Sequence, residues 1–112
     1  MCEILIANNA NVDDKNNNGA TALIVAAQNG HAEVCEKLIA NHANIDTKNN
    51  NGESALIMAA YKGHASACNT LLEKGANIND KDNDNRSALY WANENGHEDV
   101  SDLLRNRGAD PI

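Results

Sequence analysis

The sequence predicts an all-α repeat solenoid, in which helix–turn–helix units stack and send β-hairpin or turn loops out to one side. The first observation is that Gly52–Ala76 has one related copy before it and one after it, at 19–43 and 85–109. The second is a Gly-His pair that returns every 33 residues, with its imidazoles at His31, His64 and His97. Such a period is typical of a supersecondary unit that buries a core only by stacking on its neighbours.

Each unit is predicted to begin with a short helix. A hydroxyl residue stands just before each apolar run, where a helix N-cap is expected, at Thr21, Ser54 and Ser87. The run 22–27 and its copies have helical periodicity, with small alanines where close packing is needed. Each run is followed by a glycine, which adopts the left-handed conformation at low cost and can end the helix, at Gly30, Gly63 and Gly96.

A second helix and a loop complete the predicted unit. In the first full copy, one face of this helix carries Val34, Cys35, Leu38 and Ile39. The segments 44–52 and 77–84 are rich in Asn, Asp and Lys and suit a turn or hairpin. The three cysteines are also 33 residues apart, at Cys2, Cys35 and Cys68. We expect buried thiols, because stacked helices hold equivalent atoms roughly 8–10 Å apart, too far to share a metal.

The chain is predicted to be one domain over residues 1–112. We divide it into a partial N-terminal repeat at 1–15, full repeats at 16–48 and 49–81, and a C-terminal capping repeat at 82–112. The partial repeat at 1–15 lacks the first helix of the unit, so its apolar side chains have no neighbour. The chain is therefore expected to be a piece of a longer array, or to self-associate through this incomplete repeat.

The last copy is interpreted as a cap because positions that would face a following repeat become polar. From the middle copy to the last, the changes are Ala60 to Asn93, Cys68 to Ser101 and Leu72 to Arg105. A terminal repeat with a polar outer face keeps such an array soluble. We therefore expect the array to end with this copy.

These residues resemble the ankyrin-repeat family, and the resemblance extends over nearly the whole chain. Its motifs are Gly-x-Ser-Ala-Leu at 52–56, Ala59-Ala60, Gly63-His64, Leu71-Leu72 and Gly75-Ala76-Asn77-Ile78-Asn79. The resemblance implies that a partner protein contacts the hairpin tips and the exposed side of the first helices, which together line a concave face.

Two departures from the family pattern carry expectations. Where the family prefers Pro and His in its Thr-Pro-Leu-His signature, the first full copy has Ala22 and Ile24. The resemblance then implies that the hydrogen bond of that His is lost, and we expect more apolar contact between first helices. His42 stands where Gly75 and Gly108 stand in the other copies, so that helix end should be slightly strained.

Composition argues against several classes of function. The net charge of −7 disfavours nucleic-acid phosphate or an anionic membrane as the main partner. No apolar run approaches the ~20 residues of a membrane span, and no signal segment is visible at the N-terminus. Buried thiols suit a reducing environment, so we expect a cytoplasmic or other reducing intracellular location.

Residues that suggest chemistry are interpreted as structural. The three repeat histidines should bond to nearby backbone, since repeat spacing keeps them roughly 10 Å apart, much farther than a shared metal permits. The run 80–84 is similar to the start of a calcium loop, but Asn85 replaces the required Gly and Trp91 the required Glu. We therefore expect no metal, no cofactor and no catalytic residue.

Two rows along the loops leave alternatives open. Lysines recur every 33 residues, at Lys15, Lys48 and Lys81. They form either a solvated row balanced by neighbouring aspartates or an anchor row for an acidic peptide surface. The repeated asparagines either reflect genome composition or hydrogen-bond between neighbouring loops.

The expected function is a non-catalytic protein–protein interaction module. The alternative is a structural scaffold or capping segment of a larger multidomain protein whose activity lies outside this chain. Tyr61 is the best candidate anchor, whereas Trp91 aligns with Val25 and Met58 and is expected to pack in the core. Carried over from the family by position, the candidate partner-binding residues are Lys15, Asn17, Asn18, Ala20, Gln28, Asn29, Lys48, Asn50, Asn51, Glu53, Tyr61, Lys62, Lys81, Asn83, Asp84, Arg86, Glu94 and Asn95.

Overall fold

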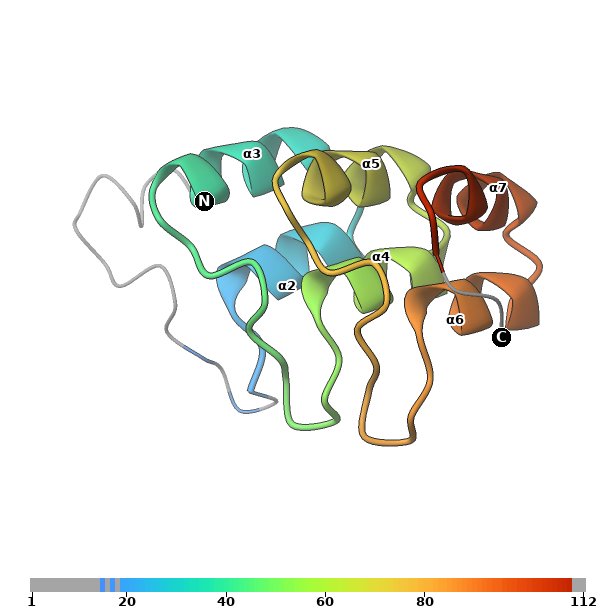
Figure 1. Ribbon diagram of the computed structural model, residues 1–112. Helices are drawn as coiled ribbons and strands as arrows, with labels where there is room; N and C mark the ends of the chain where they lie inside the picture. Colours follow the sequence, from blue (N-terminus) through green and yellow to red (C-terminus); the bar gives the residue numbers. More distant parts are fainter. Residues whose placement is uncertain (1–14, 16, 18, 110–112) are drawn as a thin grey trace.

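The computed structural model describes residue 15, residue 17 and residues 19–109 of the chain. In this part the helices come in pairs: α2 (Ala22–Gln28) with α3 (Ala32–Ala40), α4 (Ala55–Lys62) with α5 (Ala65–Glu73), and α6 (Ala88–Glu94) with α7 (Glu98–Asn106). The first helices form one row and the second helices another (Figure 1). The predicted all-α repeat solenoid is confirmed.

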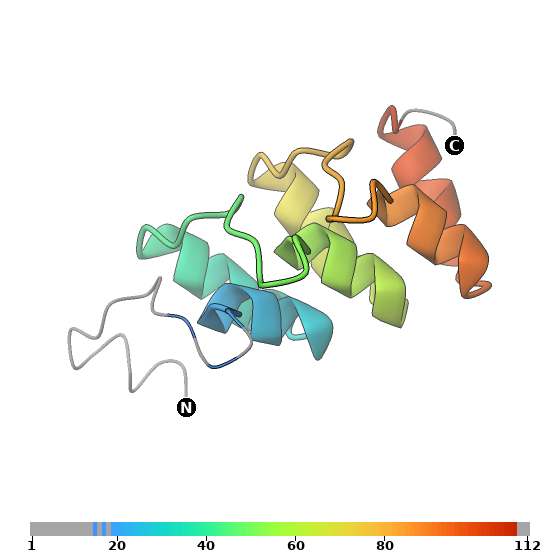
Figure 2. The same ribbon diagram turned by 90° about the horizontal axis from the view of Figure 1, so that it is seen from below.

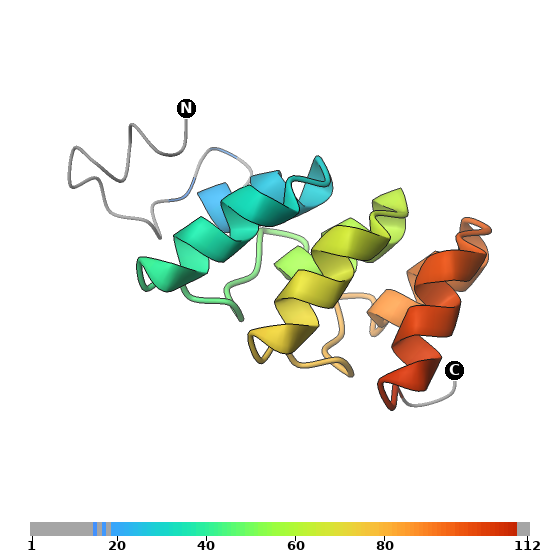
Figure 3. The same ribbon diagram turned by 90° about the horizontal axis from the view of Figure 1, so that it is seen from above.

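The pairs are stacked along the longest of the three dimensions, 41 × 24 × 20 Å. Within the first row, α4 lies between α2 and α6 and packs against both. Seen from below, the row steps from blue to green to orange (Figure 2), and seen from above, α3, α5 and α7 lie side by side (Figure 3). Among the described helices, each pair thus packs mainly against the pair next to it, as expected for a solenoid.

The first helices begin at the predicted caps. The hydroxyls of Thr21, Ser54 and Ser87 each accept a hydrogen bond, 3.3 Å long, from the backbone N–H three residues later. Such a cap satisfies one of the free N–H groups of the first turn and stabilises a helix by about 1 kcal/mol. These helices span only 7 or 8 residues, so the caps and the stacking together must hold them.

The Gly-His pairs close the first helices and bind the repeats together. Gly30 and Gly63 have φ of 75° and 80°. A Cβ on Gly30 would lie 2.7 Å from the ring of His64, and one on Gly63 would lie 2.6 Å from the ring of His97. The Nε2 of His97 is 3.1 Å from the carbonyl oxygen of Tyr61 in the preceding repeat. The predicted bond from imidazole to backbone is confirmed at this histidine.

The core is aliphatic and built from small residues between the rows. Ala27, Ala60 and Ala92 are fully buried, which lets the first helices approach closely. Ile24 and Ile57 are also buried and belong to the same core cluster. This agrees with the apolar contact expected in place of the family's histidine.

The cysteine position is buried as predicted. Cys35 and Cys68 are free thiols with no exposed surface. Burial raises the pKa of the Cys68 thiol to about 12, and the nearby Asp99 adds to the rise. Cys2 lies outside the described residues, as does almost all of the predicted partial repeat at 1–15.

The two loops that connect the three described helix pairs turn back in the same way. An antiparallel bridge joins Lys48 to Ser54 in one loop and Lys81 to Ser87 in the next. At the tip, the Oδ1 of Asn49 accepts bonds of 2.9 and 3.0 Å from two backbone N–H groups, and the Oδ1 of Asp82 does the same. A short polar side chain that mimics a turn in this way explains the Asn and Asp content of the loops.

Two side chains occupy backbone positions at which other copies have glycine. His42 has φ of 74°, where Gly75 and Gly108 have 101° and 92°. Asn85 has φ of 65°, where Gly52 has 77°. The left-handed conformation costs a residue with a Cβ roughly 1–2 kcal/mol, less for Asn. The expected left-handed geometry at His42 is therefore present.

The outer face of the last repeat is polar. Ser101 donates a 2.7 Å hydrogen bond from Oγ to the Oδ1 of Asn93, and Arg105 donates one of 3.1 Å to the same oxygen. Asn93 and Arg105 are exposed, whereas Ser101 is buried. The division of the chain into repeats at the stated boundaries, including the cap at 82–112, stays a prediction.

Candidate functional site

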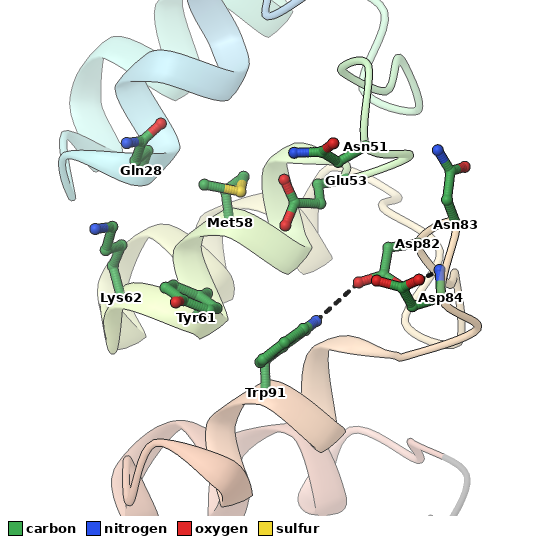
Figure 4. A pocket seen from close by; sticks show the side chains of 10 residues that line it. All are labelled: Gln28, Asn51, Glu53, Met58, Tyr61, Lys62, Asp82, Asn83, Asp84 and Trp91. Atoms are coloured by element: carbon green, nitrogen blue, oxygen red, sulfur yellow. Dashed lines mark hydrogen bonds between the residues drawn. The ribbon is translucent and has the colours of Figure 1, made fainter. Parts of the chain in front are cut away.

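A groove runs between the loop tips and the first helices. Its larger hollow, of about 540 Å³, is lined by Gln28, Asn51, Glu53, Met58, Tyr61, Lys62, Asp82, Asn83, Asp84 and Trp91 (Figure 4). A second hollow of about 510 Å³ shares four of these residues and continues over Ala20, Val25, Asn49 and Asn50. Because the two hollows share a wall, we treat them as one feature, the loop–helix groove.

The predicted partner-binding residues are Ala20, which lines the groove, and seventeen others. Eight of the seventeen also line it: Gln28, Asn50, Asn51, Glu53, Tyr61, Lys62, Asn83 and Asp84. Eight others lie outside its lining: Lys15, Asn17, Asn29, Lys48, Lys81, Arg86, Glu94 and Asn95. Asn18 lies outside the described residues. The geometry brings the middle repeat's candidates together and leaves many of the others apart, and whether any of them contacts a partner stays a prediction.

Trp91 has two roles, of which the sequence predicts one. It packs against the buried core, as expected, but it is only partly buried and also forms a wall of the groove. Its Nε1 donates a 3.0 Å hydrogen bond to the Oδ2 of Asp82. The equivalent residues Val25 and Met58 also line the groove. This column faces the loops, and its change from Val to Met to Trp was the signal that could have revealed it.

The Tyr and Trp residues of the chain form one cluster around Trp91, two of whose rings line the groove. The sequence holds one Trp, two Tyr and no Phe. The ring of Trp91 lies 5.0 Å from that of Tyr61 and 5.2 Å from that of Tyr90, both in edge-to-face geometry. Such pairs contribute roughly 0.5–1.5 kcal/mol beyond their buried area. Tyr61, expected to be an exposed anchor, is therefore half-buried and held by its neighbour.

Cations of the same chain lie over these rings. The Nζ of Lys62 is 5.6 Å from the centre of the Tyr61 ring. The guanidinium of Arg86 is 5.1 Å from the centre of Tyr90 and 5.3 Å from that of Trp91. These are cation–π distances, worth about 0.5–1 kcal/mol each at exposed sites.

Comparison with known proteins agrees with this architecture. A family model described as ankyrin repeats in 3 copies matches residues 1–82 and again residues 37–112. The chain belongs to the ankyrin-repeat family. Ankyrin repeats are generally protein–protein interaction modules and are typically non-catalytic. No curated protein matches the chain significantly.

The lysine and asparagine rows bind successive ankyrin repeats to each other. The Nζ of Lys15 donates to the carbonyl of Lys48 at 3.2 Å, and the Nζ of Lys48 donates to that of Lys81 at 2.9 Å. Lys48 also pairs with Asp80 at 2.9 Å. A lysine held by a carbonyl and a carboxylate is less available to an acidic peptide, which favours the balanced-row alternative.

The asparagines form a second row of the same kind. The Nδ2 of Asn50 donates to the carbonyl of Asn17 at 3.3 Å, and the Nδ2 of Asn83 donates to that of Asn50 at 3.1 Å. Of the two alternatives for the asparagines, hydrogen bonding between neighbouring ankyrin loops is therefore confirmed at these positions.

Two of the three aspartates in the calcium-like run 80–84 form structural bonds. Asp80 pairs with Lys48, and both carboxylate oxygens of Asp82 are engaged, one by the loop backbone and one by Trp91. Within the described residues, no three His, Cys, Asp or Glu side chains are placed to hold a metal ion. Over the same residues, none of the helices has the length and apolarity needed to cross a membrane.

Proposed function

We propose that this chain is a non-catalytic protein-binding module that holds a partner protein in the loop–helix groove. The observation that carries the proposal is the edge-to-face pair of Tyr61 and Trp91 in the groove wall, with Tyr90 packed against Trp91. Full burial of large rings would stabilise a small aliphatic core, yet Tyr61 and Trp91 are only partly buried and line a hollow of the surface. Tyr, Trp and Arg are the residues that most often supply binding energy at interfaces.

The groove also has the dimensions and the variability that recognition requires. A hollow of about 540 Å³ admits several side chains of a partner. Its lining mixes aromatic, amide and charged groups on a rigid scaffold of capped helices. Equivalent positions differ between repeats, as in the column Gln28, Tyr61 and Glu94, while the core positions stay small and apolar. Variation on a constant frame is what a binding surface needs.

The test compares a substitution inside the groove with a substitution outside it. Tyr61→Ala removes the groove anchor, and Ile39→Ala removes a half-buried residue of α3, a helix that supplies no residue to the groove. Partners captured from a cell lysate by the immobilised chain are identified, purified and titrated by calorimetry. We expect Tyr61→Ala to weaken binding by about 2 kcal/mol, the scale of a hot spot, and Ile39→Ala to leave affinity unchanged.

Equal affinity of Tyr61→Ala and the unchanged chain would contradict the proposal. A chain that captures nothing, alone or with either substitution, would favour the scaffold or capping role within a larger protein. The proposed self-association through residues 1–15 falls outside the described residues, apart from Lys15. Sedimentation at several concentrations tests it.

A further inference from the structure

The charges that line the loop–helix groove are unequal. Glu53, Asp82 and Asp84 contribute three carboxylates to the larger hollow, and Lys62 contributes one ammonium group. The second hollow adds no further charged side chain, because Glu53 is shared and its other lining residues are neutral. The groove is therefore net negative, like the chain as a whole. A partner segment of opposite charge complements it.

Two of the three carboxylates have binding capacity left. Asp82 uses one oxygen for the loop backbone and the other for Trp91. Glu53 accepts a 3.0 Å bond from Asn49 through Oε1, which leaves Oε2 for a partner. The structure gives the Asp84 carboxylate no partner among the described residues. In Figure 4 the carboxylates of Glu53 and Asp84 and the indole of Trp91 surround the same hollow.

The aromatic wall suits a cation as well. The negative π-face of a Tyr or Trp ring attracts an ammonium or guanidinium group placed within about 6 Å of its centre. Lys62 and Arg86 already use ring faces of this cluster in that way. Aromatic faces beside free carboxylates form a site for a guanidinium, which can stack on a ring and donate to a carboxylate at the same time.

We propose that the loop–helix groove docks a basic segment of the partner protein, with an arginine or lysine side chain between the Tyr61–Trp91 pair and the carboxylates of Glu53 and Asp84. This inference rests on the proposed binding function and specifies the chemistry of its partner. Recognition combines ring stacking with charge attraction. Binding should therefore weaken as salt screens the exposed carboxylates.

A selection from random short peptides displayed on phage tests the proposal without assuming a partner. The unchanged chain is expected to enrich peptides that carry Arg or Lys at one shared position. A selected peptide, made synthetically, should quench or shift the fluorescence of Trp91, which is the chain's single tryptophan. Replacing its basic residue by Gln should weaken binding about tenfold, given one charge-assisted pair and one cation–π contact.

The matched variants remove the same charge at two places. Glu53→Gln with Asp84→Asn keeps the shapes of the groove side chains and should weaken the peptide about fivefold. Glu36→Gln with Glu73→Gln changes the net charge equally on α3 and α5, whose residues are absent from the groove lining, and should leave affinity unchanged. Enriched peptides without a basic residue, an equal loss in both double variants, or no enrichment at all would overturn the proposal.

The outcome separates this inference from the function on which it rests. If captured partners depend on Tyr61 but the selected peptides are neutral or acidic, the chain is a binding module and only the basic-segment inference fails. If neither partners nor peptides depend on groove residues, both fail together.

Discussion

The internal face between the α4–α5 pair and the α6–α7 pair and the outer face of α6 and α7 use the same repeat positions with opposite chemistry. On the internal face, Ala60 and Cys68 have no exposed surface. On the outer face, their counterparts Asn93 and Ser101 bond to each other, and Arg105 joins them. None of the described helices packs on this second face. The frame of the repeat is constant, and only the side chains that meet a neighbour or water are exchanged.

The largest effect on stability should come from placing the polar residue of the outer face at the equivalent internal position. Ala60→Asn places a larger, polar side chain where neither room nor a hydrogen-bond partner exists. We expect a loss of about 3–4 kcal/mol in the free energy of unfolding, from overpacking and the unpaired amide together. Urea denaturation followed by circular dichroism measures it. A loss below about 1 kcal/mol would mean that the internal face adapts as freely as a surface.

The next effect concerns pH, because only the internal face carries a thiol at this position. The folded-state pKa of Cys68 is about 12, against an ordinary value of 9.0. Below pH 9 the thiol is protonated in both states, so its contribution to stability is fully present. As pH rises from 9 to 12, the unfolded chain releases this proton first and stability falls, by about 2 kcal/mol near pH 10.5.

The control for this titration is Cys68→Ala. Its stability should be lower at neutral pH but should depend less on pH in that window, since it has no thiol to ionise at this position. Denaturant midpoints measured at several pH values give both slopes. Parallel curves for the two proteins would refute the assignment of the pH dependence to Cys68.

A smaller effect should follow from breaking the outer polar cluster. Asn93→Ala leaves the buried hydroxyl of Ser101 and the guanidinium of Arg105 without their shared acceptor. We expect a loss of about 1 kcal/mol, the net value of a typical hydrogen bond. A double-mutant cycle with Ser101→Ala should show positive coupling between the two positions. Strict additivity would mean that the 2.7 Å bond contributes nothing to stability.

The smallest effect on stability should come from a position where one repeat differs from the others away from these two faces. His42→Gly gives this helix end the residue found at Gly75 and relieves the left-handed conformation of a side chain that is exposed. We expect a gain of up to about 1 kcal/mol, because the relief is offset by the greater freedom of glycine in the unfolded chain. Thermal unfolding measures the gain, and a loss of stability would show that the imidazole makes a contact of its own.

Periodicity made most of the fold predictable. The caps at Thr21, Ser54 and Ser87 and the buried cysteine position recur at fixed spacing, so each copy supports the assignment of the others. These features depend on local turn chemistry and on burial, which the residue types themselves encode.

The site was harder to predict because it depends on contacts between repeats. Trp91 aligns with apolar residues, and only the packing of its ring against Tyr61 of the preceding repeat reveals that the column faces the groove. Asp82 aligns with Asn49, but its second oxygen meets Trp91, whereas the amide of Asn49 meets Glu53. Aligning the copies identifies equivalent positions, but it cannot show that equivalent side chains bond to different residues.

The bonds of the lysine and asparagine rows have a consequence for how this protein can evolve. In each row the middle residue, Lys48 or Asn50, donates from its side chain to one neighbouring repeat and accepts at its backbone carbonyl from the other. A duplicated repeat inserted in register would bring its own donor and its own acceptor. The array could gain or lose whole repeats without leaving a loop donor or acceptor unpaired. Such a change in length would need no compensating substitutions in the loops.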